Sequence, residues 1–385
     1  MPASTRARHT SVFDGEPLLR TVATALLVMS RRLHAGDPVY EPVVQRAFDQ
    51  LVLLCLRRGE TPPGSVPEMA RWARSRPVTA WPLNLFDAEV TDEQLLVDPE
   101  TTTPTQFCLE WAISSPDPTA EQFENLLMNE AIATCRAAHA PDSYTALRRL
   151  MIENPVLTSG QLAELSADVD LHPVLDLIRS CYEPAPAAYL RDGRYVTCKR
   201  CGCLMVPITG GALRCELDRC KRDSTTEKGS QLPAHAGGGV HQLRRPLRVF
   251  ITGPGLAELD LERALIKLHL QPQMWPNYDA YDLRVTLPHG QVWAIDVKDR
   301  ANPALLGRTT TPFRTNPPFT QAFLVVPAYR LIEREDYQRV FNRNLPSELR
   351  GKVKLHTDKA LLAKIRAELR RARRSPDADE GDPHA

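Results

Sequence analysis

The chain has 385 residues, of which 43% are hydrophobic and 25% are charged, and its formal net charge is +1. This composition is ordinary for a globular protein, and the length predicts two or three domains rather than one core. The polar N-terminus predicts no signal peptide and no apolar run approaches the ~18 residues of a membrane span, so we predict a cytoplasmic protein without a membrane partner.

Residues 1–187 are predicted to form a helical domain. Thr158-Ser-Gly-Gln161 is a capping box for a helix that runs to Ala167. A hairpin at 189–197, turning at Asp192-Gly193, would allow a winged helix–turn–helix near 143–197. An ordinary helical bundle is the preferred interpretation, because no base-reading residues can be identified. Apolar residues recur with helical spacing at 18–34, 41–58, 120–138, 144–153 and 171–182.

A cluster of cysteines follows this domain. Cys198 and Cys201, and then Cys215 and Cys220, form C-x2-C and C-x4-C pairs, a pattern typical of a tetrahedral zinc site with four thiolates. Cys203 is a spare, and Cys201 is preferred to it for its spacing. Because the protein supplies all four ligands, we predict structural Zn²⁺ in a zinc-ribbon-like module at 188–230. Disulfides are the alternative. A glycine-rich linker is expected at 231–246.

Residues 281–298 have the pattern of a β-hairpin. Alternate positions from Leu283 to Val297 are apolar, and Pro288-His-Gly290 fits a three-residue loop. In that register Asp282 lies directly opposite Asp296, with their Cβ atoms about 4.5–5.5 Å apart. Lys298 projects from the same face. Two such carboxylates repel each other and require a cation between them.

This triad predicts a metal-dependent phosphodiesterase. Asp282 and Asp296 offer the oxygen ligands that Mg²⁺ or Mn²⁺ prefers, and such an ion neutralises phosphate charge and activates water. The Lys298 ammonium would stabilise developing charge or orient the water. The alternative is a solvent-facing strand pair with scattered charges, because D-x-K alone is common.

Asp282 and Asp296-Val-Lys298 resemble the PD-(D/E)xK motif of the restriction-endonuclease-like superfamily, with Tyr281 in place of the nominal proline. The expected elements are a helix at 256–270, a short segment at 272–276, the hairpin, a short helix near 303–308 and a strand at 322–326. Their order resembles the αβββαβ core of that superfamily. The resemblance implies a nuclease domain at 247–374. It also implies a metal-assisting glutamate on the first helix, best matched by Glu262, with Glu258 one turn earlier.

The chain is therefore predicted to be a multidomain α + α/β protein with a helical N-terminal region, a four-cysteine zinc module and a C-terminal restriction-endonuclease-like core. A helix near 331–341, a strand at 352–356 and a basic helix at 358–374 are expected after the core. Residues 191–250 and 351–374 each carry a net charge of +7, which favours contact with phosphate backbones. The acidic tail, 375–385, is expected to be disordered.

The domain order also resembles the restriction-endonuclease (REase) component of bacterial pPIWI-RE three-gene defence islands. That resemblance implies a PIWI/Argonaute-like protein and a helicase as partners, in defence against foreign DNA. We predict a Mg²⁺-dependent deoxyribonuclease. The alternatives are a non-catalytic, zinc-containing DNA-binding adaptor and a scaffold of a defence complex. The sequence does not predict an oligomeric state.

Overall fold

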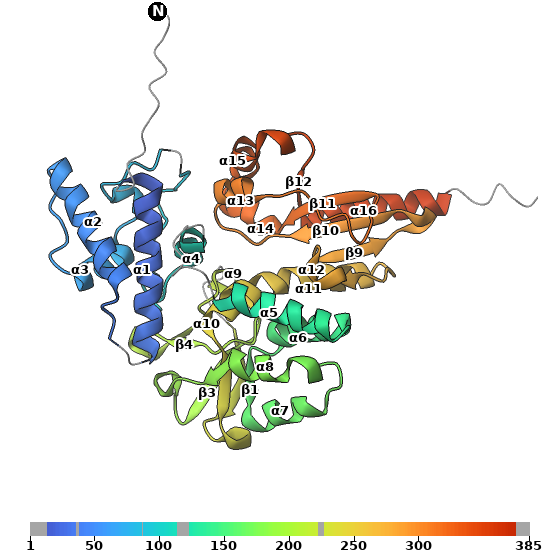
Figure 1. Cartoon of the computed structure of the whole chain (residues 1–385), viewed down its shortest axis with the longest axis horizontal. Coiled ribbons are helices and arrows are strands. Elements are labelled where there is room, and N and C mark those ends of the chain that lie inside the picture. Colours follow the sequence, from blue (N-terminus) through green and yellow to red (C-terminus); the bar gives the residue numbers. More distant parts are fainter. Residues whose placement is uncertain (1–13, 36–37, 87, 114–122, 222–226, 375–385) are drawn as a thin grey trace, which may run out of the picture. The chain divides into compact units, whose positions relative to one another are not determined.

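The computed structural model describes residues 14–35, 38–86, 88–113, 123–221 and 227–374 (Figure 1). The acidic tail that is predicted to be disordered lies outside them. Contacts divide the chain into two units. The first contains residues 1–126, 184–236 and 301–306, and the second contains 127–183, 237–300 and 307–385. The predicted boundary after residue 187 differs from this division, because 127–183 groups with the candidate nuclease segment.

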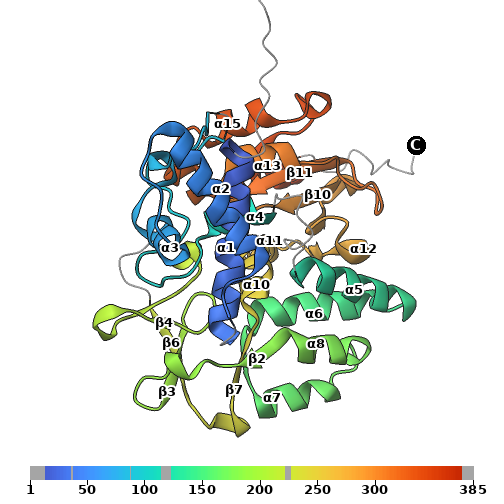
Figure 2. The same cartoon turned by 60° about the vertical axis from the view of Figure 1, so that its left-hand side comes forward.

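Helices form the N-terminal part of the first unit (Figure 2). α1 packs against both α2 and α4, and its apolar stripe, which includes Leu18 and Leu19, is fully buried. Gly59 ends α2 in the left-handed conformation, with φ of 71°. The helices predicted at 18–34 and 41–58 are thus confirmed, whereas α3 and α4 were not predicted. The bounds are α1 Gly15–Ala35, α2 Pro42–Arg58, α3 Val66–Ser75 and α4 Gln106–Ile113.

The cysteine-rich segment of the first unit consists of two short antiparallel strand pairs. β3 (Arg194–Cys198) pairs with β6 (Lys228–Pro233), and β4 (Val206–Pro207) pairs with β5 (Leu213–Arg214). The hairpin predicted at 189–197 is reduced to one bridge, between Arg191 and Arg194, around a turn with positive φ at residues 192 and 193. β3 takes β6 as its main partner instead.

The linker predicted at 231–246 contains regular structure. It contains the end of β6 and all of β7 (Val240–Leu243), and Gly237, Gly238 and Gly239 between them all have positive φ. These glycines build a tight turn that approaches Thr158 closely, since a Cβ on Gly237 would lie 2.7 Å from the Thr158 hydroxyl. The glycine run therefore serves a fixed backbone conformation rather than flexibility.

The helical part of the second unit surrounds a small sheet with strand order β1-β7-β2. The capping box at Thr158 is present in full, with its side chain bonded to Gln161 N–H and the reciprocal bond returned. β7, not the segment 189–197, lies beside β2, so the hairpin expected for a winged helix–turn–helix is not part of this sheet. The bounds are α5 Phe123–Ala137, α6 Pro141–Glu153, β1 Val156–Thr158, α7 Ser159–Glu164, α8 Leu175–Cys181 and β2 Tyr182–Pro184.

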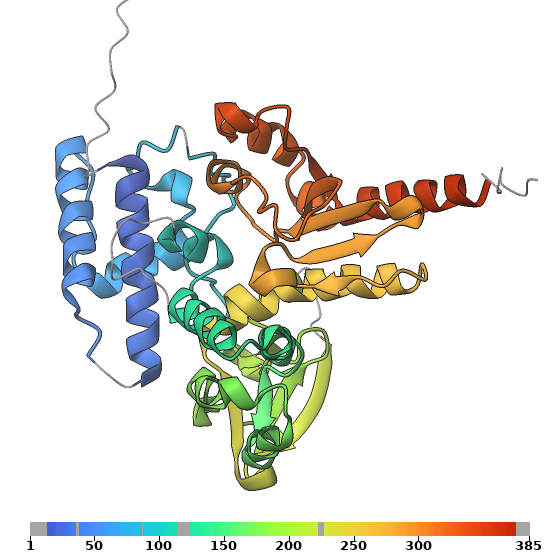
Figure 3. The same ribbon diagram turned by 45° about the vertical axis from the view of Figure 1, so that its right-hand side comes forward.

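The rest of the second unit is built on a five-stranded sheet with order β12-β11-β10-β9-β8 (Figure 3). β8, β9 and β10 run antiparallel, whereas β10, β11 and β12 are parallel. α16 covers the face that carries the fully buried Trp293, and the Lys364 ammonium lies 5.4 Å from the centre of that ring. The bounds are α11 Gly253–Ile266, β8 Gln273–Met274, α12 Pro276–Asp279, β9 Leu283–Thr286, β10 Val292–Val297, α13 Pro303–Thr309, β11 Gln321–Val326, α14 Ala328–Glu333, α15 Tyr337–Asn344, β12 Leu355–Thr357 and α16 Asp358–Arg374.

These elements follow the predicted order closely, although the single helix expected at 331–341 is divided into α14 and α15. Within the part of the chain that the structure describes, no helix combines the length and the apolar character needed to cross a membrane.

Candidate functional site

The hairpin of β9 and β10 has the register predicted from the sequence. Leu283 pairs with Ile295 and Thr286 pairs with Val292, so the next position places Asp282 opposite Asp296. Leu287 N–H donates to Gln291 across the three-residue loop. The apolar residues of the alternating pattern are buried. This burial fixes the register, because a slip by one residue would turn the charged face into the core.

Asp282, Asp296 and Lys298 meet at the end of this hairpin. The Lys298 Nζ lies 2.8 Å from Asp296 Oδ1 and 3.7 Å from Asp282 Oδ2. Asp282 Oδ2 also accepts a 2.6 Å hydrogen bond from Val297 N–H. Lys298 itself is held in the sheet by its backbone N–H, which donates to Val325 of β11. The ammonium therefore bridges the two opposed carboxylates, as the sequence predicted for a cation.

Burial and neighbouring charges shift the protonation of this triad. Burial, then the charge of Glu258, raises the pKa of the Asp282 carboxyl well above its usual range, and Lys298 offsets only part of the rise. Burial alone would lower the pKa of Lys298, yet the carboxylates of Asp282 and Asp296 raise it. The side chain of Asp282 is 5% exposed and that of Lys298 is 37% exposed. A buried carboxyl therefore faces a cation that reaches solvent.

Both glutamates of α11 bind an arginine, and Glu258 is the one whose charge acts on the hairpin carboxylates. Both oxygens of Glu262 are engaged by Arg149, at 2.7 and 3.1 Å. Glu258 is buried, raises the pKa of Asp282 and interacts electrostatically with Lys298. Burial raises the pKa of Glu258 itself, against the lowering effect of Arg148. The glutamate one turn earlier on α11 is thus the one coupled to the hairpin carboxylates.

Asp279 is a further acidic residue that the sequence did not single out. Its Oδ2 accepts hydrogen bonds from Arg148 and from the Tyr144 hydroxyl, and its charge contributes to the raised pKa of Asp282. Trp275, Asn277, Tyr278 and Asp279 all have positive φ, between 44° and 69°. Such non-glycine residues cost about 1–3 kcal/mol each and cluster at functional sites. The feature that the sequence analysis missed is a strained turn directly before Asp282.

The centre carries more negative than positive charge. Glu258, Asp279, Asp282 and Asp296 are four carboxylates, and the cations bonded to them are Arg148 and Lys298. When all are ionised, two negative charges remain uncompensated, which is the charge of one divalent cation. Carboxylate oxygens are the ligands of hard cations such as Mg²⁺ and Mn²⁺, so the chemistry of the Asp282 and Asp296 side chains suits such an ion.

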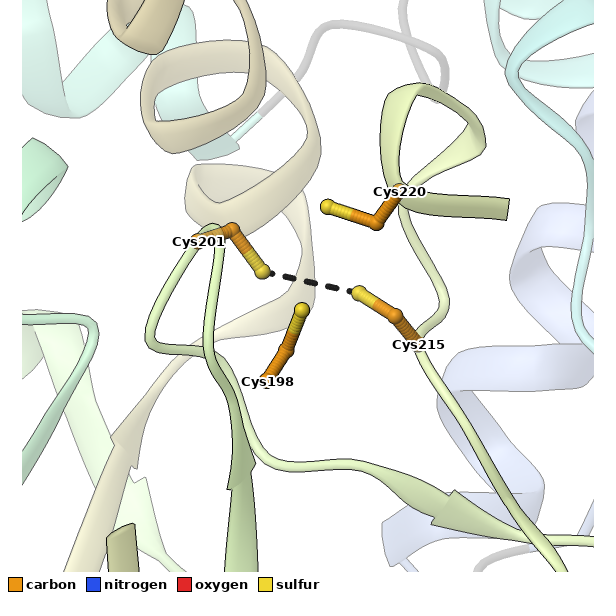
Figure 4. A group of neighbouring side chains, drawn as sticks. All are labelled: Cys198, Cys201, Cys215 and Cys220. Carbon is orange, nitrogen blue, oxygen red and sulfur yellow. Dashed lines mark hydrogen bonds between the residues drawn. The ribbon is translucent and has the colours of Figure 1, made fainter. Parts of the chain in front are cut away.

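The four predicted cysteines form a second centre, in the first unit (Figure 4). Their sulfur atoms all lie within 4.8 Å of one another, and all four residues are buried. Cys201 Sγ and Cys215 Sγ are 3.5 Å apart. Hydrogen bonds from the other three thiols lower the pKa of Cys198. The arrangement of four convergent sulfurs could bind a metal ion such as Zn²⁺.

Cys203 lies outside the four-sulfur group, as its spacing predicted. It is fully buried, and its carbonyl accepts a hydrogen bond from Cys198 N–H. Gly202, between Cys201 and Cys203, has φ of 73°, and its N–H donates to the Cys198 carbonyl. This tight turn places the two thiols of the C-x2-C pair on the same side of the knuckle. Cys203 thus supports the turn through its backbone carbonyl.

Two family models match the chain. Residues 18–158 match the pPIWI_RE three-gene island domain Y, and residues 255–373 match the REase associating with pPIWI_RE. Together these two matches support assignment of the chain to the REase component of the pPIWI-RE islands. No curated protein and no solved structure matches it. The REase segment begins on α11 and includes the whole Asp282, Asp296 and Lys298 centre, whereas the cysteine group lies between the two matched segments.

Proposed function

We propose that this pPIWI-RE REase component is a metal-dependent nuclease that hydrolyses DNA phosphodiester bonds. The observation that carries the proposal is the bridged pair of carboxylates, in which Asp282 and Asp296 oppose each other across two strands with Lys298 between them. The match to an REase family supports it. We further propose that the elements from α11 to β11 are the αβββαβ core of the PD-(D/E)xK superfamily.

Each residue of the centre has a role that its position supports. Asp282 and Asp296 would hold Mg²⁺ or Mn²⁺, which supplies charge neutralisation and water activation when bound. Lys298 is the cation of the triad, and its side chain is partly exposed. We assign its ammonium to the phosphate oxygens or to the attacking water. Glu258 replaces Glu262 as the assisting acid, and it acts through its charge on Asp282 because Arg148 holds both of its oxygens. The buried end of β10 holds these groups in fixed positions.

A basic helix of the same unit supports nucleic acid as the substrate. Lys359, Arg366 and Arg370 of α16 are exposed and lie seven and four residues apart, which places them on one side of the helix. Such a stripe attracts phosphate backbones through a salt-dependent electrostatic interaction. The four cysteines would hold Zn²⁺ as a structural ion. Because the matched families are named for pPIWI-RE islands, we propose a PIWI/Argonaute-like protein and a helicase as partners in defence against foreign DNA.

The test is cleavage of plasmid and single-stranded DNA in Mg²⁺, Mn²⁺ or EDTA. We expect cleavage that needs metal and is lost in Asp296→Ala, with zinc content and folding unchanged. Asp260→Asn, an exposed acid on α11 that pairs with Arg263, is the matched control and should cleave like wild type. Equal activity in wild type and Asp296→Ala would refute this site. Absence of cleavage in both, with the proposed partners present, would favour the non-catalytic adaptor.

A further inference from the structure

A second pair of carboxylates lies beside the first and has its own cation. Arg148 donates to both oxygens of Glu258, at 3.1 and 3.0 Å, and to Asp279 Oδ2. The Trp275 indole N–H also donates to Glu258, and the Arg148 guanidinium lies 5.0 Å from the centre of that ring. Arg148 thus bridges Glu258 and Asp279 as Lys298 bridges Asp282 and Asp296.

Arg148 comes from outside the segment that matches the REase family. It lies on α6, within the domain Y match, and α6 is closely packed against the start of α11 in the second unit. The Thr252 hydroxyl donates to the Met151 carbonyl, and a Cβ on Gly255 would overlap the side chain of Ile152. The domain Y segment therefore delivers a cation to the candidate nuclease centre.

Arg148 and Lys298 differ in how easily they can be displaced from their carboxylates. The side chain of Arg148 is 9% exposed and that of Lys298 is 37% exposed. Lysine is a point charge on a flexible stem, which can turn to solvent when another cation arrives. Arg148 binds both oxygens of Glu258 and is packed on the Trp275 ring, so these contacts hold it in place. An incoming cation would consequently replace Lys298 between its carboxylates and leave Arg148 in place.

We propose that Arg148 is a positioning residue of the nuclease centre, a fixed internal cation that retains Glu258 and Asp279 so that only one divalent ion binds, at Asp282 and Asp296. The proposal rests on the metal-dependent function proposed above. Removal of Arg148 would leave three uncompensated negative charges and free both of its acids. Within the described residues, Asp279 Oδ1 is buried without a hydrogen-bond partner, so this acid has an oxygen available for a second ion.

The test counts Mn²⁺ ions bound by the full chain with its zinc in place, using electron paramagnetic resonance of free Mn²⁺. The ion at Asp282 and Asp296 is the one that Asp296→Ala removes. We expect one in wild type and two in Arg148→Met. Arg149→Met is the matched control, because Arg149 is the next residue on α6 and also pairs with a glutamate of α11. It should keep one ion.

Two ions in wild type would overturn the proposal without reference to any variant. One ion in a folded Arg148→Met, as judged by circular dichroism, would also overturn it. If the methionine variant does not fold, Arg148→Gln takes its place, because its amide can still donate to Glu258 without supplying charge. If Asp296→Ala removes no Mn²⁺ at all, the metal centre of the proposed function fails. A failure of the Arg148 proposal is therefore distinguishable from a failure of the proposed metal centre.

Discussion

The clearest consequence of the opposed carboxylates is that Asp282→Asn should not destabilise the metal-free protein. Asparagine has nearly the same shape and can still accept the hydrogen bond from Val297 N–H. A neutral acceptor is weaker than a charged one, which costs about 1 kcal/mol. Against this, folding raises the pKa of Asp282 well above its ordinary value. Each unit of such a rise corresponds to about 1.4 kcal/mol.

The sign of the pH dependence follows from that rise. A carboxyl whose pKa is higher in the folded state binds its proton more tightly when folded, so stability falls as pH rises from about 4 towards the folded pKa. At pH 8 in EDTA, the raised pKa of Asp282 therefore opposes the loss from the weaker hydrogen bond. Asp282→Asn should therefore be at least as stable as wild type there, and it should lose less stability between pH 5 and pH 8.

Mg²⁺ should reverse the order of stability, so that wild type becomes more stable than Asp282→Asn. An ion at one hundred times its dissociation constant stabilises the state that binds it by about 2.7 kcal/mol. For a unit of this size that corresponds to a rise in melting temperature of roughly 5–10 °C. Thermal unfolding with Mg²⁺ and with EDTA measures both effects, and Asp260→Asn is the control that should respond like wild type. An Asp282→Asn protein that loses more than about 2 kcal/mol in EDTA, or that keeps the Mg²⁺ response, would refute the reasoning.

Two further predictions concern the choice between neighbouring residues. Cys220→Ser should lower the zinc content measured by mass spectrometry from one ion per chain to none, whereas Cys203→Ser should retain the ion. Equal loss of zinc in both variants would contradict the assignment of ligands. Glu258→Gln should reduce Mg²⁺-dependent cleavage at least tenfold, because its charge acts on Asp282, whereas Glu262→Gln should change cleavage less than threefold. The reverse order in a cleavage assay would restore Glu262 as the assisting acid.

The hairpin was predictable because one physical rule determined it completely. Apolar alternation from Leu283 to Val297, with Gln291 as the polar interruption and a loop of known length, favours one register, and that register fixes which acids face each other. Asp279 was not predictable in this way. Its position depends on a turn of left-handed residues, which non-glycine side chains rarely adopt. The contacts with Arg148 and Tyr144 that accompany this turn come from α6, far away in the sequence.

The helices show the same limit to prediction from the sequence. The helix α16 was predicted with its observed bounds, because an acidic N-terminal residue and a long amphipathic repeat mark it. α4 was missed because its residues Phe107 to Ala112 are buried all round, so no polar face gives it a helical period. Glu110 lies within this buried stretch, where its carboxylate accepts hydrogen bonds from Ala301 and Asn302 N–H of the same unit. Only the fold reveals such a partner.

The choice between Glu258 and Glu262 shows why family-based expectation and structure diverge at this site. Both glutamates lie on one face of α11, four residues apart, so periodicity cannot separate them. α6 separates them by giving each its own arginine, with Arg148 on Glu258 and Arg149 on Glu262. The first pair is buried and electrostatically coupled to Asp282, whereas Arg149 is 35% exposed. A helix that belongs to the domain Y match thus gives the two acids different surroundings beside the proposed centre.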